Sequence, residues 1–235
     1  MSSLANPLRR FVASALAERA NPEHAGPMQA YMKTDMPFLG VKKPDRISIE
    51  REMKRRFAPA DRQEWEEGVL ALWSLPHREG KYLAIEYAKA YRAHAVPASL
   101  PLFERLIREG AWWDLVDDVA AHLVGRVWST ARDWTGPRMD AWIDDPDLWI
   151  RRTAIIGQLK HKADTDSERL FRYCRARMHE REFFMRKAIG WALRQYGYSA
   201  PGPVREFLLT HRAELSGLSF REGARVLIKQ GLMEP

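Results

Sequence analysis

Trp113 and Asp117 are the side chains whose types and spacing point most directly to chemistry. They stand four residues apart in the stretch Trp112-Trp-Asp-Leu-Val-Asp117, so on a helix the indole and the carboxylate lie within reach of each other on one shoulder. On the same helical wheel Asp114 and Asp118 point towards solvent. A carboxylate that faces a basic surface repels phosphates unless it meets something positive. The plainer interpretation of Asp117 is an ion pair with a neighbouring arginine.

Basic residues recur around these acids at regular intervals. In front of a set of aligned alanines stand, in chain order, Lys81, Asp117-Asp118, Arg151-Arg152, Arg186-Lys187 and Arg221. A row of cations along one surface suits a phosphate backbone, because arginine forks onto phosphate oxygens. The alternative is a solvated charged edge on each helix.

The elements that must position these side chains follow from an internal repeat. Charged residues lead into an apolar run at intervals of 36, 34, 34 and 36 residues, aligned on Ala84, Ala120, Ala154, Ala188 and Ala224. Such an interval is typical of two-helix repeats, and a fainter copy lies near Ile49. Turns are expected at the breakers Pro76, Pro97 with Pro101, Gly136-Pro137, Pro146 and Gly202-Pro203. We predict an all-α superhelical solenoid that forms a single domain over residues 1–235.

Composition limits the classes of function. There are 38 Lys and Arg against 31 Asp and Glu, a net charge of +7, and the basic residues are mostly arginine, which favours nucleic-acid binding. Hydrophobic residues make up 46% of the chain, which excludes a disordered protein, and no apolar run is long enough to span a bilayer. The N-terminus is expected to form an amphipathic helix rather than a signal peptide. The single cysteine, Cys174, excludes a disulfide framework and fits a reducing cytoplasm.

Other chemical signatures are missing from the sequence. It has no phosphate-cradling glycine-rich loop, no H-E-x-x-H and no nucleophile elbow, and its seven histidines are scattered. We therefore expect no metal and no cofactor. Most of the nine tryptophans are expected in the core. In the alanine frame Trp191 matches Leu123 and Gly157, which predicts a core position for it as well.

Several blocks together resemble a known family, the AlkD-like DNA alkylation repair glycosylases. The matching blocks are Tyr31-Met-Lys33 with Pro37-Phe-Leu-Gly40, Leu72-Trp-Ser-Leu-Pro-His-Arg-Glu79, Trp112-Trp-Asp-Leu-Val-Asp117, Asp147-Leu-Trp-Ile-Arg-Arg152, Gln158-Leu-Lys160, and Glu182-Phe-Phe-Met-Arg-Lys-Ala-Ile-Gly-Trp191 with Arg194. The resemblance runs in order from about residue 20 to residue 195. It implies about six HEAT-like helix-pair repeats that hold duplex DNA in a basic groove.

The resemblance also implies roles for individual residues. It places the catalytic carboxylate at Asp117, with Trp113 and Trp191 as the active-site tryptophans. Arg152 is the implied DNA-contacting arginine, whereas the alanine frame alone does not choose between it and Arg151. Further DNA-binding candidates, from the resemblance, the cation row and the basic loop after Gly40, are Tyr31, Arg194, Lys42, Lys43, Arg186 and Lys187. The loop after Gly40 departs from the family pattern, in which smaller polar residues often precede the proline.

The implied activity is hydrolysis of the N-glycosidic bond of cationic N3- or N7-alkylated purines in duplex DNA, which initiates base excision repair without flipping the base. Asp117 would stabilise positive charge on the sugar and position the attacking water, while Trp113 and Trp191 would pack against the deoxyribose. Two alternatives stay open, namely a non-catalytic DNA-binding protein of the same fold and a HEAT-type protein scaffold. The protein is expected to be a monomer, with damaged duplex DNA as its partner and no membrane.

Overall fold

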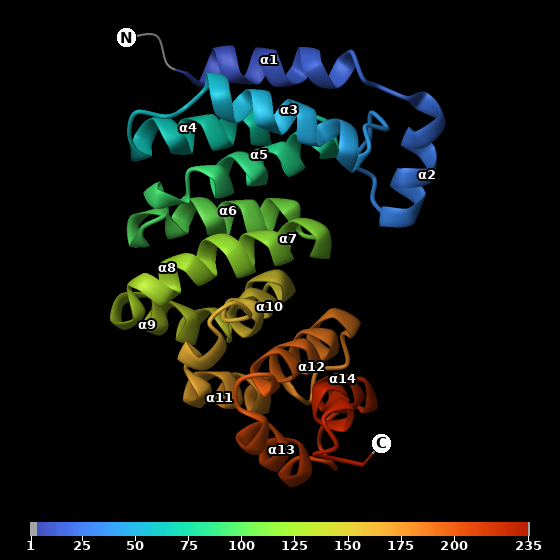
Figure 1. The fold of residues 1–235 in the computed structure, drawn as a ribbon, viewed down its shortest axis with the longest axis vertical. Coiled ribbons are helices and arrows are strands. Elements are labelled where there is room, and N and C mark those ends of the chain that lie inside the picture. The colour runs from blue at the N-terminus through green and yellow to red at the C-terminus, as the bar shows by residue number, and fades with distance from the viewer. Residues whose placement is uncertain (1–3, 235) are drawn as a thin grey trace. The chain divides into compact units, whose positions relative to one another are not determined.

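The computed structural model describes residues 4–234, and the chain divides into two compact units, Met1–Leu102 and Phe103–Pro235. Over the described residues the chain is helical throughout and contains no strand (Figure 1). The predicted all-α fold is confirmed. That the whole chain acts as a single domain stays a prediction.

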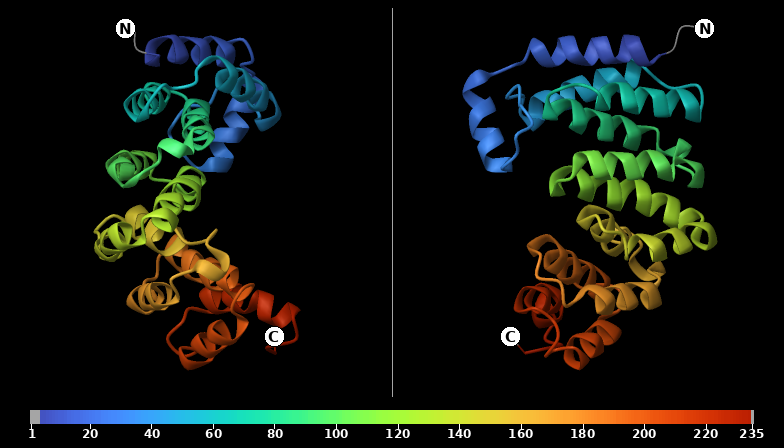
Figure 2. Two further views of the ribbon diagram at one scale, coloured as in Figure 1. Left: turned by 60° about the vertical axis from the view of Figure 1, so that its left-hand side comes forward. Right: turned by 180° about the vertical axis from the view of Figure 1, so that it is seen from behind.

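The first unit is a stack of helices with one helix across its end. Its elements are α1 (Ala5–Ala17), α2 (Pro22–Met32), α3 (Lys43–Arg56), α4 (Arg62–Trp73), α5 (Arg78–Ala90) and the 3-10 turns η1 (Arg92–His94) and η2 (Pro97–Ser99). α1 packs on α3 and α4, and α5 packs on the same two helices, whereas α2 runs across the end of the stack (Figure 2). α1 is the expected amphipathic helix, because Leu8, Val12 and Leu16 are buried at four-residue spacing.

The second unit repeats one arrangement of helices. Its elements are α6 (Leu100–Gly110, which begins just before the division), α7 (Trp113–Val119), the π-helix η3 (Ala120–Val124), α8 (Gly125–Thr130), α9 (Arg132–Trp142), α10 (Leu148–Ile156), the 3-10 turn η4 (Lys162–Asp164), α11 (Ser167–Arg177), α12 (Phe183–Gly197), α13 (Pro201–Thr210) and α14 (Gly217–Lys229). In this unit α7, α10, α12 and α14 are neighbours in turn, while α11 and α13 each link and contact two of them. This is a helical-repeat arrangement.

The aligned alanines lie in the core, as the repeat predicts. Ala84, Ala120, Ala154, Ala188 and Ala224 are all at most 1% exposed. A small side chain at this place lets neighbouring helices approach closely. The alanine frame therefore gives the correct inward-facing register for α5, η3, α10, α12 and α14.

The break expected at Gly136-Pro137 is wrong, since α9 continues through both residues. Pro137 removes one backbone hydrogen bond from the second turn, while Asp140 in the next turn holds α9 to α11 through ion pairs with Arg169 and Arg172. Gly136 explains part of this packing: a Cβ there would lie 2.8 Å from the guanidinium carbon of Arg169. A side chain at residue 136 would displace that arginine.

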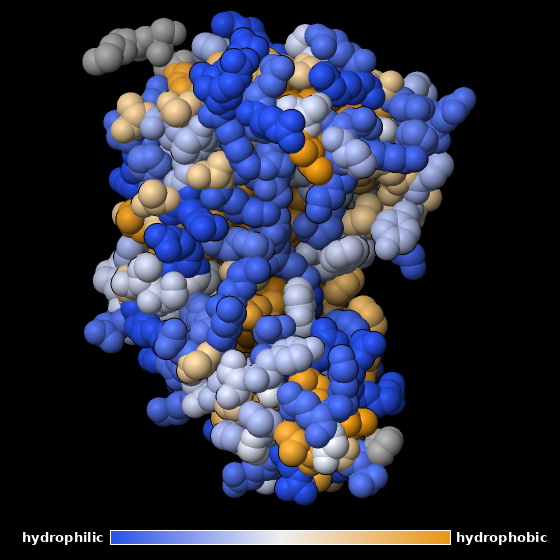
Figure 3. All heavy atoms as spheres, viewed as in Figure 1, coloured by the Kyte–Doolittle hydropathy of each residue, from blue (hydrophilic) through white to orange (hydrophobic). Residues whose placement is uncertain are grey.

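The surface in view is mostly hydrophilic, with small apolar patches over the C-terminal helices (Figure 3). Among residues 4–234, no helix combines the length and the apolar character needed to cross a bilayer.

Candidate functional site

α7 presents Trp113 and Asp117 as the helical wheel predicts. The helix starts after Ala111, whose φ is 36°, and the carbonyl of Trp112 accepts the first helical hydrogen bonds. Leu115, Val116 and Val119 bury one face of the helix. The indole of Trp113 stays 37% exposed, so the opposite shoulder is open to solvent.

Trp113, Asp117 and Trp191 meet in one pocket of about 580 Å³. The pocket is formed by α7 and η3, the turn that follows α10, and α12; its lining residues are Trp113, Asp114, Asp117, Asp118, Ala121, His122, Leu159, Lys160, Lys162, Trp191 and Gln195. Trp191 is half-buried and lines this pocket, so the core position predicted from the alanine frame is wrong. The structure brings together the three residues for which the resemblance implies an active site.

Asp117 forms a two-point ion pair with Arg152 from α10. Nε and Nη2 of Arg152 lie 2.7 Å and 2.8 Å from the two carboxylate oxygens, and its Nη1 donates to the carbonyl of Phe184 on α12. The side chain of Arg152 is 3% exposed and that of Asp117 is 16% exposed. The plainer interpretation of Asp117, an ion pair with a neighbouring arginine, is confirmed.

The electrostatics of Asp117 combine opposing effects. Burial raises the pKa of its carboxyl above the ordinary value, Arg152 lowers it through hydrogen bonding and charge, and Asp114 and Asp118 raise it further. The net direction is upward. Arg152 opposes this rise, because protonation of Asp117 would leave the buried guanidinium without a counter-charge.

The structure corrects the expected place of Arg152 and Arg151 as cations on the surface. Arg152 is buried against Asp117, so in this conformation its guanidinium faces protein and not solvent. Nε and Nη2 of Arg151 each lie 3.1 Å from an oxygen of Glu180, and its Nη1 donates to the carbonyls of Asp145 and Pro146. Both arginines hold helices together rather than project outwards.

Several of the other predicted cations also contact carboxylates or backbone carbonyls of the protein. Lys187 lies 2.7 Å from Glu222 on α14, and Arg194 pairs with the same carboxylate. Arg186 is half-buried, and Nζ of Lys81 in the first unit donates to carbonyls at the end of α4. Contact between these residues and DNA stays a prediction.

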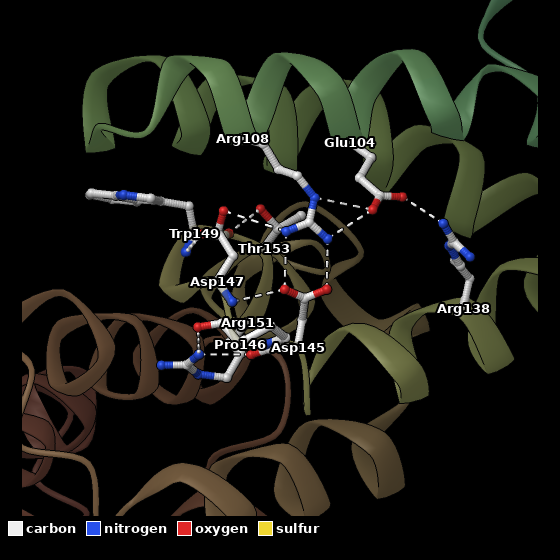
Figure 4. Close-up of polar contacts among 9 residues, drawn as sticks. All are labelled: Glu104, Arg108, Arg138, Asp145, Pro146, Asp147, Trp149, Arg151 and Thr153. Atoms are coloured by element: carbon white, nitrogen blue, oxygen red, sulfur yellow. Dashed lines mark hydrogen bonds and ion pairs between the residues drawn. The ribbon is translucent and has the colours of Figure 1, made fainter.

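A network of ions fixes the start of α10, the helix that carries Arg152 (Figure 4). Arg108 on α6 donates to Glu104 and, through two nitrogens 2.7 Å and 3.1 Å away, to Asp145. The carboxylate of Asp147 then caps α10 by accepting from the backbone amide of Trp149 at 2.7 Å. Arg108 also holds the pKa of Asp145 below its usual range, chiefly through this hydrogen bonding.

Sequence reasoning missed much of the pocket wall. The helical wheel correctly placed Asp114 and Asp118 on the side away from the core. It did not predict that they line a pocket together with Asp117. His122, Lys160 and Lys162 also line the pocket. The four-residue spacing from Asp114 through Asp118 to His122 was the available signal.

The remaining predicted residues belong to the first unit. Tyr31 on α2 is 78% exposed, and Lys42 and Lys43 are exposed at the start of α3. The carboxylate of the buried Glu79 holds the preceding loop, because it accepts from the backbone amides of residues 39–41 at 2.9–3.1 Å. The loop therefore presents the two lysines from a fixed base.

Comparison with known proteins identifies the family. The family model described as DNA alkylation repair enzyme matches residues 12–227. The chain belongs to this family. A solved structure described as a predicted DNA alkylation repair enzyme from Enterococcus faecalis is 29% identical, with a TM-score of 0.81 over 90% of this chain and 98% of that one. No curated protein matches the chain.

Membership of a DNA alkylation repair family supports an enzymatic role and implies DNA as the partner. Within residues 4–234, no group of three or more His, Cys, Asp or Glu side chains is arranged to hold a metal ion.

Proposed function

We propose that this protein is a DNA glycosylase that hydrolyses the N-glycosidic bond of cationic N3- and N7-alkylated purines in duplex DNA, initiating base excision repair. The observation that carries the proposal is the pocket in which Trp113 and Trp191 stand beside Asp117. Asp114 and Asp118 line the same pocket. Three carboxylates and two indoles suit a positively charged sugar and base.

The substrate class removes the need for a general acid. An N3- or N7-alkylated purine already carries positive charge, so its glycosidic bond is weakened and the base leaves without further protonation. Positive charge then develops on the deoxyribose. A fixed carboxylate opposite that charge stabilises the transition state, and one well-placed group of this kind contributes roughly 3 to 4 kcal/mol.

The ion pair changes how Asp117 works. Arg152 offsets part of the carboxylate's charge, but it also fixes the orientation of the carboxylate and favours its ionised form. Asp114 and Asp118 add negative charge around the pocket. We therefore assign electrostatic stabilisation to the three acids together, with Asp117 held most rigidly and Arg152 as its positioning residue.

Binding of the duplex rests on other side chains. Lys42, Lys43 and Tyr31 in the first unit and Lys160 and Lys162 at the pocket are candidates for backbone contacts, because all five are exposed. The base is proposed to stay stacked in the duplex. A 2-aminopurine placed beside the lesion tests this, since its fluorescence should stay low when the protein binds and should rise if the base flips.

Release of base from methylated DNA tests the proposal directly. Duplex DNA treated with a methylating agent is incubated with the protein, and free 3-methyladenine and 7-methylguanine are measured against a protein-free control for spontaneous loss. Enzyme-dependent release supports the glycosylase. Duplex binding without release would favour a non-catalytic DNA-binding protein, and absence of both would favour a protein scaffold.

A further inference from the structure

His122 lines the pocket but has no part in the glycosylase proposal so far. It lies in η3, four residues after Asp118, and its Nε2 is 3.4 Å from Oδ1 of that aspartate. Both side chains are about one-third exposed. Among the residues that line the pocket, histidine is the type whose charge changes near neutral pH.

Hydrolysis leaves one proton to be placed. When the C1′–N bond breaks, its electron pair goes to the purine nitrogen and neutralises the base. The water oxygen then bonds to C1′, and the water must release a proton. Both oxygens of Asp117 accept hydrogen bonds from Arg152, so a proton placed on Asp117 would leave the buried guanidinium without a counter-charge.

The local backbone fixes where His122 lies. The π-helix η3 joins α7 to α8 and packs on α10, and π-turns of this kind often mark functional sites. Gly125 permits the close approach, since a Cβ there would lie 2.3 Å from the carbonyl oxygen of Gly157. Nε2 of the buried His161 is 2.8 Å from the carbonyl oxygen of Gly125, which secures the end of the turn.

The charged groups around His122 come from two parts of the pocket. Asp114, Asp117 and Asp118 on α7 favour its protonated form, while Lys160 and Lys162 from the turn after α10 favour its neutral form. Nε2 of His122 lies within ion-pair distance of the neighbouring Asp118, at 3.4 Å from Oδ1. An imidazole in a pocket that is lined by both acids and lysines is suited to taking up a proton and releasing it again.

We propose that His122, paired with Asp118, is the general base that takes the proton from the attacking water. The proposal rests on the glycosylase activity proposed above and extends it. In the step, water bonds to C1′ through oxygen, its proton moves to the neutral imidazole, and the purine departs with the electrons of the broken bond. Asp118 then stabilises the imidazolium until the proton passes to solvent.

The test is a pH profile of single-turnover release of 7-methylguanine from methylated duplex, measured from about pH 5 to 8.5, the range in which histidine titrates. With the wild type, the rate should rise with pH as the imidazole becomes neutral. His122→Gln should lose this rise and fall about tenfold or more below the wild type at the upper end. In Asp118→Asn the rise should move to lower pH, because an acid that favours the imidazolium is gone.

His211 offers a matched control. Its Nδ1 lies 3.0 Å from Glu214, so it also pairs with a carboxylate, but it does not line the pocket. His211→Gln should keep the wild-type profile, and all variants should share its unfolding midpoint and duplex affinity. In His122→Ala, added imidazole should restore part of the rate, which a purely structural role does not predict.

Each outcome decides the matter. Loss of the rise in His122→Gln, its shift in Asp118→Asn and rescue by imidazole support the proposal. An unchanged profile in His122→Gln overturns it while leaving the glycosylase in place. If the wild type releases no base at any pH, the proposed function itself fails and the role of His122 falls with it. Should His122→Gln not fold, Asp118→Asn decides through the position of the rise.

Discussion

Two ion pairs occupy corresponding places in the second unit, and they differ in their surroundings. Asp117, Arg152, Lys187 and Glu222 follow one another at intervals of 35 residues on α7, α10, α12 and α14. Asp117 pairs with Arg152, and Glu222 pairs with Lys187. In the first pair Arg152 is buried and Asp117 borders a pocket with two further acids, whereas Lys187 in the second is 38% exposed.

The difference shows that the repeat position alone does not make a site. The same inward shoulder of each helix carries a charged residue, and in both cases its partner is supplied by the next helix of the row. What distinguishes Asp117 is the opening beside it, lined by Trp113 and Trp191. A charge pair that would otherwise join two helices is thereby placed against a ligand-sized space.

Removal of one partner from each ion pair should give the largest difference between the two pairs, measured as the loss in free energy of unfolding. Arg152→Ala leaves Asp117 largely buried without its counter-charge, which should lower the free energy of unfolding by about 3 kcal/mol. Glu222→Gln should cost about 1 kcal/mol or less, because both of its partners, Lys187 and Arg194, stay partly exposed to solvent. Urea unfolding of both variants measures the two losses. Equal losses would show that the environments of the pairs do not differ as described.

Salt dependence of duplex binding separates buried from exposed cations. Lys160 is exposed at the pocket, so Lys160→Ala should reduce the slope of log affinity against log salt by about 1. Arg152→Gln should leave this slope unchanged on undamaged duplex, since the guanidinium faces Asp117. Fluorescence anisotropy at several salt concentrations gives both slopes. A reduced slope in Arg152→Gln would show that Arg152 leaves Asp117 to meet a phosphate.

The smallest expected effect is on stability at acid pH. Protonation of Asp117 and protonation of Glu222 should change the free energy of unfolding in opposite directions. Lys187 lowers the pKa of Glu222, so this group contributes stability at neutral pH that is lost as pH falls below its ordinary value of 4.5. Burial raises the pKa of Asp117, so the folded protein takes up this proton before the unfolded chain does. Relative to Asp117→Asn, the wild type should therefore gain stability as pH falls towards 3.8.

Unfolding by urea at about pH 7, 5 and 3.5 checks these signs. The difference between wild type and Glu222→Gln should shrink as the solution becomes acidic. If acidification changed the stability difference between wild type and variant in the same direction for both pairs, the contrast in their environments would be contradicted.

Much of the fold could be predicted because it is periodic. The alanine register identified the inward face of α5, η3, α10, α12 and α14, and the spacing of Trp113 and Asp117 put them on one shoulder. The turn predicted at Gly136-Pro137 is wrong, because composition alone does not show that a helix can continue through a proline when contacts with a neighbouring helix stabilise it. The π-turn of Ala120–Val124 left no periodic signal either.

The site could be predicted only in part, because it depends on contacts across repeats. Arg152 belongs to a row of charged residues in the sequence, and its burial follows from the register of α10 against α7, which a helical wheel does not contain. Trp191 was assigned to the core because an indole at an apolar position normally packs there. Its place at the edge of a pocket became visible only with α7 and α12 positioned together.

Excision by Asp117→Asn tests the central claim most directly. Single-turnover release of 7-methylguanine from methylated duplex is compared for wild type, Asp117→Asn and the control Glu222→Gln, with duplex affinity measured in parallel. The account predicts that Asp117→Asn binds duplex normally and loses roughly a hundredfold or more in rate, while Glu222→Gln keeps the wild-type rate. Unchanged excision by Asp117→Asn would contradict it.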